Sequence, residues 1–322
     1  MSESPTSSGL TTNVPPTVSV IACGGAGLNM LRRVLPDIKG RVSYKLLDTS
    51  IANLQPGEKA FIIGGGGSGL VQDQNADAAN KAIAGISDEE LGLSDINIVI
   101  FALSGGSGAV VGPKLIHDIA GRRKKLVIAL VVSSTQSKKH TTNTMDTLRG
   151  LRKKCDDVGL YLPITIFDNN AGGRAAVDRA FTYKLARLVD LLTAPTIEID
   201  KNDRVHWVDV PKTIGKQLTG LRLLRVETRT DKNTEIPNTE VWPDIKDHVY
   251  DSVLAIGSKS QVNNNLPRAQ VVFEGEFTTI ELVSICGTIG NPKGAFDNFL
   301  RDINNTLNGY NVSAESHDDP FG

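Results

Sequence analysis

The amino-acid sequence predicts an α/β fold with a parallel-sheet domain, a long central helix and a smaller second α/β domain. Short apolar runs alternate with amphipathic stretches over the first half of the chain, which is typical of a parallel sheet covered by helices on both faces. Glycine-rich turns follow two of these runs directly. A long amphipathic stretch at 175–194 then separates them from a second set of strand-like runs.

The composition indicates a globular protein with its own apolar core. Hydrophobic residues make up 40% of the 322 residues, and 35 basic against 36 acidic side chains leave a net charge of −1. Such a chain has no general attraction for nucleic acid or an anionic membrane, and no apolar run approaches the roughly 20 residues of a membrane span. Cys23, Cys155 and Cys286 are far apart and lack histidine partners, which argues against disulfides and zinc. We therefore expect a soluble, cytoplasmic protein.

The chain begins with residues 1–16, a predicted disordered arm rich in Ser, Thr, Pro and Gly. An apolar run at 17–23 follows, and the turn Gly24-Gly25-Ala26-Gly27 leads into a helical stretch. A strand, a glycine turn and a helix in this order can hold a phosphate at the helix N-terminus. The turn nearly matches the dinucleotide pattern Gly-x-Gly-x-x-Gly, but Met30 occupies the third glycine position, so an NAD-linked oxidoreductase is a less favoured alternative.

The glycine loop at 104–109 is a second unit of this kind. It joins a predicted strand at 96–102 to a helix and consists of Ser104, Gly105, Gly106, Ser107, Gly108 and Ala109. We expect its glycines to permit positive φ and to press backbone N–H groups against an anion. A P-loop is excluded because Lys114 does not directly follow Gly112. The loop is either a phosphate site or a turn without a ligand.

The remaining elements of the first domain place further polar residues near strand ends. A strand at 44–49 contains Asp48, and the glycine run at 64–69 is either a loop over phosphates or a surface linker. The other predicted elements are a helix at 73–83, a strand at 126–132, a helix at 141–155 that contains Asn143, and a strand at 161–167 that is followed by Asn169 and Asn170. In parallel sheets ligands bind beyond the carboxyl ends of the strands.

The central helix at 175–194 carries Asp178 near its start and is followed by Pro195 and a loop at 196–203. This loop bears Asp200 and Asp203, whose three-residue spacing lets both carboxylates face one side of a helical turn. They are either helix-capping carboxylates or part of a shared metal, water and phosphate site.

The second half of the chain predicts a smaller α/β domain. Strand-like runs lie at 221–226, 253–256, 269–273 and 278–285, and helical pieces lie at 210–218 and 244–249. A C-terminal amphipathic stretch has apolar residues at 296, 299, 300, 303 and 307, which cover either its own body or a neighbour. The polar residues 308–322 form an acidic tail.

Three motifs in combination resemble the tubulin/FtsZ superfamily of GTPases: residues 20–29, the glycine loop and residues 199–203. Within it the chain is most similar to the phage tubulins of the PhuZ branch. Three features indicate this branch: the length of the chain, the strand sequence Leu162-Pro163-Ile164 with the later Gly173-Arg174, and the sequence Val110-Val111-Gly112-Pro113 that continues the glycine loop. The chain departs from the pattern at several positions: Ser104 replaces the first glycine of the loop, Ser107 replaces threonine, Ala109 lacks the usual hydroxyl, and Glu198 stands where FtsZ usually has asparagine.

The resemblance implies a division of the chain and a set of site residues. The parts are an arm (1–16), a GTP-binding domain (17–174), the central helix (175–194), a second, activation domain that starts with the catalytic loop (195–290), and a C-terminal helix and tail (291–322). The pocket for GTP or GDP, with Mg²⁺ carried mainly by the nucleotide, would be formed by Gly24, Gly25, Ala26, Asn29, Asp48, Ser104, Gly105, Gly106, Ser107, Gly108, Ala109, Asn143, Asn169, Asn170 and Asp178.

Within this set the resemblance gives several residues distinct roles. Asp178 would read guanine, although a carboxylate there also favours the helix dipole. Asn143, Asn169 or Asn170 would hold the ribose or the base. Asp200 and Asp203 would act catalytically on the nucleotide of the next subunit.

The resemblance further implies a GTPase that polymerises head to tail into dynamic filaments and positions phage DNA or a phage nucleus in an infected bacterium. Its partner would be a second copy of itself. The acidic tail would either contact the neighbouring subunit or be disordered. An alternative from another class is a nucleotide-binding structural or regulatory protein that assembles without turnover.

Overall fold

The computed structural model describes residues 14–64, 76–170, 173–195, 199–213, 218–226, 252–258, 268–273, 283–289 and 295–315. The strands are β1 (Val18–Cys23), β2 (Ser43–Asp48), β3 (Phe61–Ile62), β4 (Ile96–Ala102), β5 (Leu126–Ser133), β6 (Leu162–Asp168), β7 (Leu218–Val226), β8 (Ser252–Ser258), β9 (Arg268–Phe273) and β10 (Val283–Ile289). The helices are α1 (Gly24–Ile38), α2 (Ala76–Gly85), α3 (Ser107–His117), α4 (Lys138–Val158), α5 (Arg174–Thr193), α6 (Lys201–Thr213) and α7 (Ala295–Glu315). Short turns are η1 (Ile51–Asn53) and the π-helical η3 (Asp118–Arg122).

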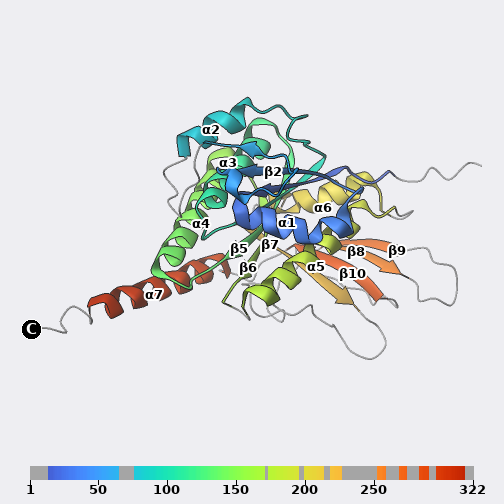
Figure 1. Ribbon diagram of the computed structural model, residues 1–322. Helices are drawn as coiled ribbons and strands as arrows, with labels where there is room; N and C mark the ends of the chain where they lie inside the picture. The colour runs from blue at the N-terminus through green and yellow to red at the C-terminus, as the bar shows by residue number, and fades with distance from the viewer. Residues whose placement is uncertain are drawn as a thin grey trace, which may run out of the picture.

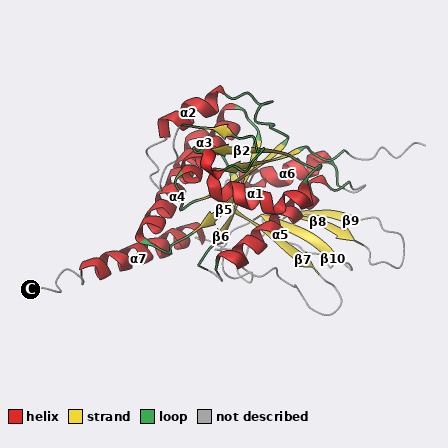
Figure 2. Cartoon of the chain, viewed as in Figure 1, coloured by secondary structure: helices red, strands yellow, loops and turns green. Residues whose placement is uncertain are grey.

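The strands are ordered β3-β2-β1-β4-β5-β6-β7-β10-β8-β9 (Figure 1). From β3 to β7 all neighbours are parallel, and from β7 to β9 all are antiparallel. Strand β7 belongs to both parts, because 218–220 pair with β6 and 221–226 pair with β10. Figure 2 shows β7, β8, β9 and β10 together beside the helical layers. The predicted α/β class with a parallel sheet is confirmed.

Apolar strands divide the core between the two faces of the sheet. In β1, Val20 and Ala22 pack with α1 and α5 on one face, whereas Ile21 and Cys23 pack with α2, α3 and α4 on the other. All three central strands β1, β4 and β5 are almost wholly buried, as a sheet covered on both faces requires. Burial raises the pKa of the Cys23 thiol, with Asp48 adding to the effect, so this cysteine is an inert core residue.

Helix α5 corresponds to the predicted central helix. Its buried stripe includes Val177, Phe181, Leu185 and Leu188, and the Phe181 ring lies 5.0 Å from that of Phe167 on β6. Twenty residues at 1.5 Å each give the helix a length of about 30 Å. It therefore connects two distant ends of the molecule.

Three predicted boundaries differ from the structure. The helix expected at 210–218 is wrong, because α6 already begins at Lys201 with a cap from the preceding aspartate and ends at Thr213. The polar tail expected from 308 is helical as far as Glu315, as part of α7. The strand expected at 278–285 is described from Val283 onward as β10. The helix predicted at 244–249 lies outside the described residues.

The apolar stripe of α7 packs against the rest of the chain. Ile303 is buried, and Phe299 and Leu300 pack against the same core as α3 and α4. The stripe therefore covers the body of its own chain. Among the described helices, none has the length and apolar character of a membrane span.

Candidate functional site

Five parallel strands end at one edge of the sheet, which we call the carboxyl edge. Strands β1, β2, β4, β5 and β6 end there, at Cys23, Asp48, Ala102, Ser133 and Asp168. The predicted nucleotide residues follow these ends in the chain or lie on helices that begin there. Asp200 and Asp203 do not, because they begin α6 at the far end of α5.

The two glycine turns pack directly against each other at this edge. A Cβ on Gly24, which has a φ of +71°, would lie 2.4 Å from the backbone nitrogen of Gly108. A Cβ on Gly108 would lie 2.7 Å from the carbonyl oxygen of Cys23. Both positions exclude any side chain, so the close approach of the two backbones explains why glycine stands at them.

The expectation of positive φ in the glycine loop is wrong. Among the described residues with positive φ, Gly24 is present but no residue of 104–109 is. Gly106 caps α3 with φ −92° and ψ −74°, values close to the right-handed helical region. Glycine is used here for close contact and an unobstructed surface rather than for a left-handed turn.

Helix α4 supports the glycine loop from behind. The side-chain amide of Asn143 donates to the carbonyl oxygens of Ser104 (3.1 Å) and Gly105 (3.4 Å), and the Thr147 hydroxyl donates to that of Leu103 (2.9 Å). In a trans peptide the next N–H points opposite to the carbonyl. The N–H groups of 104–106 therefore point away from α4, as an anion cradle requires. The buried position of Asn143 favours this supporting role over a contact with ribose or base.

Asp48 organises the turn that follows β2. Its carboxylate is buried and accepts from the Thr49 backbone N–H (2.6 Å) and from the Asn53 side-chain amide (2.8 Å). The Thr49 hydroxyl lies 2.5 Å from that of Ser107 in the glycine loop. A Cβ on Gly25 would lie 3.0 Å from the Asn53 side chain. Asp48 thus holds Thr49 and Asn53 against both glycine turns.

Thr49 and Asn53 were missed in the sequence analysis. The available signal was the polar sequence that directly follows Asp48 at a strand's carboxyl end. Asx and hydroxyl side chains in such a position commonly bond the local backbone.

Arg32 on α1 secures the same turn. It donates to both carboxylate oxygens of Glu58 (2.8 and 2.5 Å), to the Asn53 carbonyl (2.6 Å) and to the side-chain oxygen of Asn29 (2.7 Å). Hydrogen bonding to Arg32 holds the pKa of Glu58 below its ordinary value. The exposed Asn29 side chain is therefore oriented by a neighbour one helical turn away.

Asp178 lies where α5 meets α1. Its carboxylate forms an ion pair of 3.1 Å with Arg33, and its side chain is 15% exposed. Asn29 and Arg33 are four residues apart on α1 and share a face of that helix. Asn29 and Asp178 are consequently presented from two adjoining helices.

Asn169 and Asn170 follow β6 at the same edge. The Asn169 backbone N–H donates to the Ser133 carbonyl (3.1 Å), which continues the pairing with β5. The Asn170 side-chain amide donates to the hydroxyl of Thr135 (2.5 Å) and to the carboxylate of Asp168 (2.8 Å). Of the glycine run at 64–69, only Gly64 is described, and it has a φ of +84°.

Asp200 and Asp203 form a reciprocal cap at the start of α6. Asp200 Oδ1 accepts from the Asp203 N–H (2.9 Å), and Asp203 Oδ2 accepts from the Asp200 N–H (3.0 Å). The adjacent Lys201 forms an ion pair of 2.7 Å with Asp95, which immediately precedes β4. The two aspartates therefore lie at the amino edge of the sheet, opposite the glycine turns.

Arg204 fixes this cap to the end of α5. Its side chain is buried, and its guanidinium donates to the carbonyl oxygens of Leu192 (3.2 Å) and Ala194 (2.5 Å). Burial lowers the pKa of Arg204, an effect opposed by Asp203 and Asp200. The first turn of α6 is thus held in a defined position on the last turn of α5.

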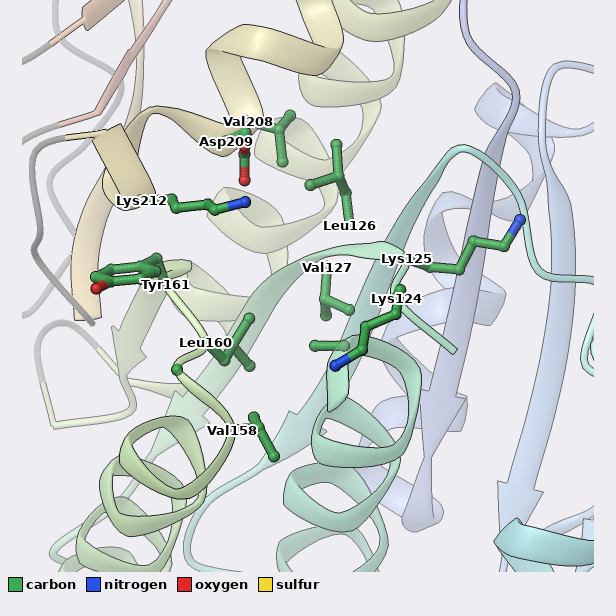
Figure 3. A pocket seen from close by; sticks show the side chains of 12 residues that line it. Lys124, Lys125, Leu126, Val127, Val158, Leu160, Tyr161, Val208, Asp209 and Lys212 are labelled. Atoms are coloured by element: carbon green, nitrogen blue, oxygen red, sulfur yellow. The ribbon is translucent and has the colours of Figure 1, made fainter. Parts of the chain in front are cut away.

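A cavity of about 330 Å³ also lies at the amino ends of β5 and β6 (Figure 3). Its walls are Ala120, Lys124, Lys125, Leu126, Val127, Val158, Gly159, Leu160, Tyr161, Val208, Asp209 and Lys212. No residue of the predicted nucleotide pocket lines this cavity, and neither Asp200 nor Asp203 does. It is separate from the candidate site.

Comparison with known proteins gives a consistent assignment of the fold. No protein-family model matches the chain. A phage tubulin-like protein of Pseudomonas phage PhiPA3 is 22% identical over 223 residues, which are 68% of this chain and 69% of that protein. The protofilament structure of TubZ from bacteriophage PhiKZ has a TM-score of 0.71 at 17% identity and covers 95% of this chain and 94% of that one.

The structure of the phage tubulin PhuZ with GDP also has a TM-score of 0.71, at 18% identity, with coverage of 95% of this chain and 94% of that one. These matches confirm the resemblance found in the sequence. The chain has a tubulin/FtsZ-like fold and is similar in sequence to the phage tubulins.

Proposed function

We propose that this protein binds GTP at the carboxyl edge and hydrolyses it when the Asp200–Asp203 turn of a second copy closes on that edge. The observation that carries the proposal is the separation of the two parts. The anion cradle lies at one end of α5 and the capped aspartates lie at the other, about 30 Å away. No side chain spans that distance, so one copy alone cannot unite them.

The carboxyl edge supplies what a nucleotide needs. Residues 104–106 and the first turn of α3 present N–H groups at a helix N-terminus, where the helix dipole favours phosphate. Asp178 would accept from guanine N1–H and N2–H together, donors that adenine does not offer at these positions. Asn29 and Asn170 are the remaining polar contacts for ribose or base.

Magnesium fits this edge as a companion of the nucleotide. Within the described residues no group of three His, Cys, Asp or Glu side chains could hold a metal ion, and Asp48 already accepts two hydrogen bonds. In this proposal the phosphate oxygens bind Mg²⁺, with the Thr49 and Ser107 hydroxyls as polar neighbours. The ion would neutralise charge that develops on the phosphates.

The aspartates can act without losing their caps. Each cap uses one carboxylate oxygen, Oδ1 of Asp200 and Oδ2 of Asp203. The second oxygen of each can accept a hydrogen bond from water and orient it toward a γ-phosphate. The capping role and the catalytic role are thus compatible.

Assembly follows from this division of the site. A head-to-tail contact that joins the carboxyl edge of one copy to the amino edge of the next repeats without closing and gives a filament. The protofilament structure of TubZ from bacteriophage PhiKZ supports this arrangement. We extend it to a filament in the cytoplasm of an infected bacterium that positions phage DNA or a phage nucleus, with the C-terminal tail contacting the neighbouring subunit.

GTP turnover measured against protein concentration tests the proposal. Specific activity should rise above a threshold concentration at which filaments appear in electron micrographs, because each site needs two copies. Filaments without phosphate release would instead favour a structural protein that assembles without turnover. Binding of NAD in preference to GTP in a nucleotide titration would contradict the proposal altogether.

A further inference from the structure

Helix α7 packs against α4 and against the turn that precedes α4. At one end Arg152 donates to the Asp297 carboxylate (2.9 Å), with both side chains largely exposed. At the other end the Tyr310 hydroxyl donates to the carbonyl oxygen of Thr135 (2.7 Å). Between them, Ile303 is buried in the core. The two helices are therefore antiparallel, and Tyr310 lies against the turn that follows the carboxyl end of β5.

Thr135 belongs to the turn between β5 and α4, and its two oxygens face two different partners. The backbone carbonyl accepts from Tyr310, while the side-chain hydroxyl accepts from the Asn170 amide (2.5 Å). A series of hydrogen bonds thus runs from the C-terminal helix through one turn to a residue of the candidate nucleotide site.

The second bond of Asn170 defines how its side chain is oriented. Its amide also donates to the Asp168 carboxylate (2.8 Å), and an ionised carboxylate only accepts. Both amide hydrogens are therefore used, one by Thr135 and one by Asp168. The side-chain oxygen of this exposed residue is then held as an acceptor for a hydroxyl or N–H donor of a ligand.

We propose that Tyr310 is a positioning residue for the nucleotide site and acts through Thr135 on Asn170. This inference rests on the proposed function. A turn without the Tyr310 contact would be less ordered, and Asn170 would lose part of its orientation before the ligand arrives. Because linkage is reciprocal, bound nucleotide would in turn hold the end of α7 on the body of the subunit.

The substitution Tyr310→Phe removes one oxygen atom and leaves the half-buried ring in place. We expect the affinity for GTP, measured by titration below the assembly threshold, to fall about 3- to 10-fold, as for one hydrogen bond. Arg152→Ala is the matched control, since it breaks the ion pair between α4 and α7 and should leave the affinity unchanged. Thr135→Ala should weaken binding like Tyr310→Phe, whereas Thr135→Ser should retain the parental affinity.

A double-mutant cycle separates positioning from a general loss of stability. If Tyr310 acts through Asn170, adding Tyr310→Phe to Asn170→Ala should cause little further loss of affinity. Losses that simply add, or a parental affinity in Tyr310→Phe, would overturn the inference and leave the proposed function intact. A parental protein that does not bind GTP would instead refute the proposed function, and this inference with it.

Discussion

The two ends of α5 differ in what their polar groups are arranged to do. At the carboxyl edge the two glycine turns are in contact. Side chains of α4 donate hydrogen bonds to the carbonyl oxygens of 103–105, so the N–H groups that follow point away from α4. At the amino edge Asp200 and Asp203 are held by their own backbone and by the buried Arg204. One end presents backbone N–H groups, and the other presents carboxylates.

Neither end would be sufficient for phosphoryl transfer in this account. The carboxylate in the interior of the carboxyl edge, Asp48, is already bonded to Thr49 and Asn53 and holds a turn in place. In the described part of the chain, neither glycine turn lies beside the carboxylates of the amino edge. This difference indicates why self-assembly and catalysis would be a single event, and the predictions below test the two ends separately.

The largest effect is expected from Asp203→Asn at the amino edge. Asparagine can still accept from the Asp200 N–H, so the cap and the fold should persist, but the negative charge that orients water is lost. Turnover should fall by about 100-fold or more while GTP binding and assembly remain. Phosphate release and filament sedimentation measured on one sample check this prediction.

The control for Asp203→Asn is Asp190→Asn on α5. Asp190 is also a partly buried aspartate, paired with Arg41 and Arg187, but it is not part of the cap. Its replacement should leave turnover near the parental rate. Parental turnover in Asp203→Asn would assign the aspartates to capping alone.

A smaller effect is expected from Gly105→Ala at the carboxyl edge. The new Cβ would lie 3.8 Å from its nearest neighbours, the Cβ and carbonyl oxygen of Ala102, and the residue has no positive φ. The free protein should therefore unfold at the parental temperature. Bound phosphate would meet the added methyl group, so the affinity for GTP should fall about 10-fold, or 1.4 kcal/mol.

Gly108→Ala provides the contrast, because its Cβ would lie 2.7 Å from the Cys23 carbonyl oxygen. This variant should lose thermal stability as well as affinity. Thermal unfolding and nucleotide titration of both proteins give the comparison. Unchanged GTP binding in Gly105→Ala would mean that phosphate lies elsewhere.

The smallest effect concerns the Arg32–Glu58 pair that secures the turn after β2. Because the pKa of Glu58 is lowered in the folded protein, the contribution of its carboxylate to stability is present above the ordinary value of 4.5 and is lost as the pH falls below it. Glu58→Gln should thus lower the melting temperature slightly at pH 7 and have a progressively smaller effect as the pH falls below 4.5. A difference that does not shrink at lower pH would show that charge is not its cause.

Much of the fold could be predicted from the sequence because it follows from patterns within single segments. The apolar runs of β1, β4 and β5 and the periodic stripe of α5 were recognisable, and the structure has these elements within a residue or two of the predicted bounds. The start of α6 was misjudged, because a reciprocal aspartate cap begins the helix well before its apolar residues.

The site was less accessible to sequence reasoning because its geometry depends on contacts between distant segments. Nothing local to Asn143 indicates that its amide supports a loop 38 residues away. The expectation of positive φ in the glycine loop was wrong for a similar reason. Glycine is needed at position 108 because the backbone of β1 lies too close for a side chain, and not because of the conformation of its own turn. Likewise, the contact between Tyr310 and Thr135 joins residues 175 positions apart.

Mixing two defective proteins tests the central claim most directly. Asp203→Asn subunits have a sound carboxyl edge, and Gly105→Ala subunits have a sound amino edge. If each active site is formed by two copies, and GTP is too dilute to fill the weakened Gly105→Ala pocket, the mixture should release phosphate faster than the sum of the two proteins assayed alone at the same total concentration. A mixture that gives only that sum, although both proteins enter the same filaments, would contradict the account.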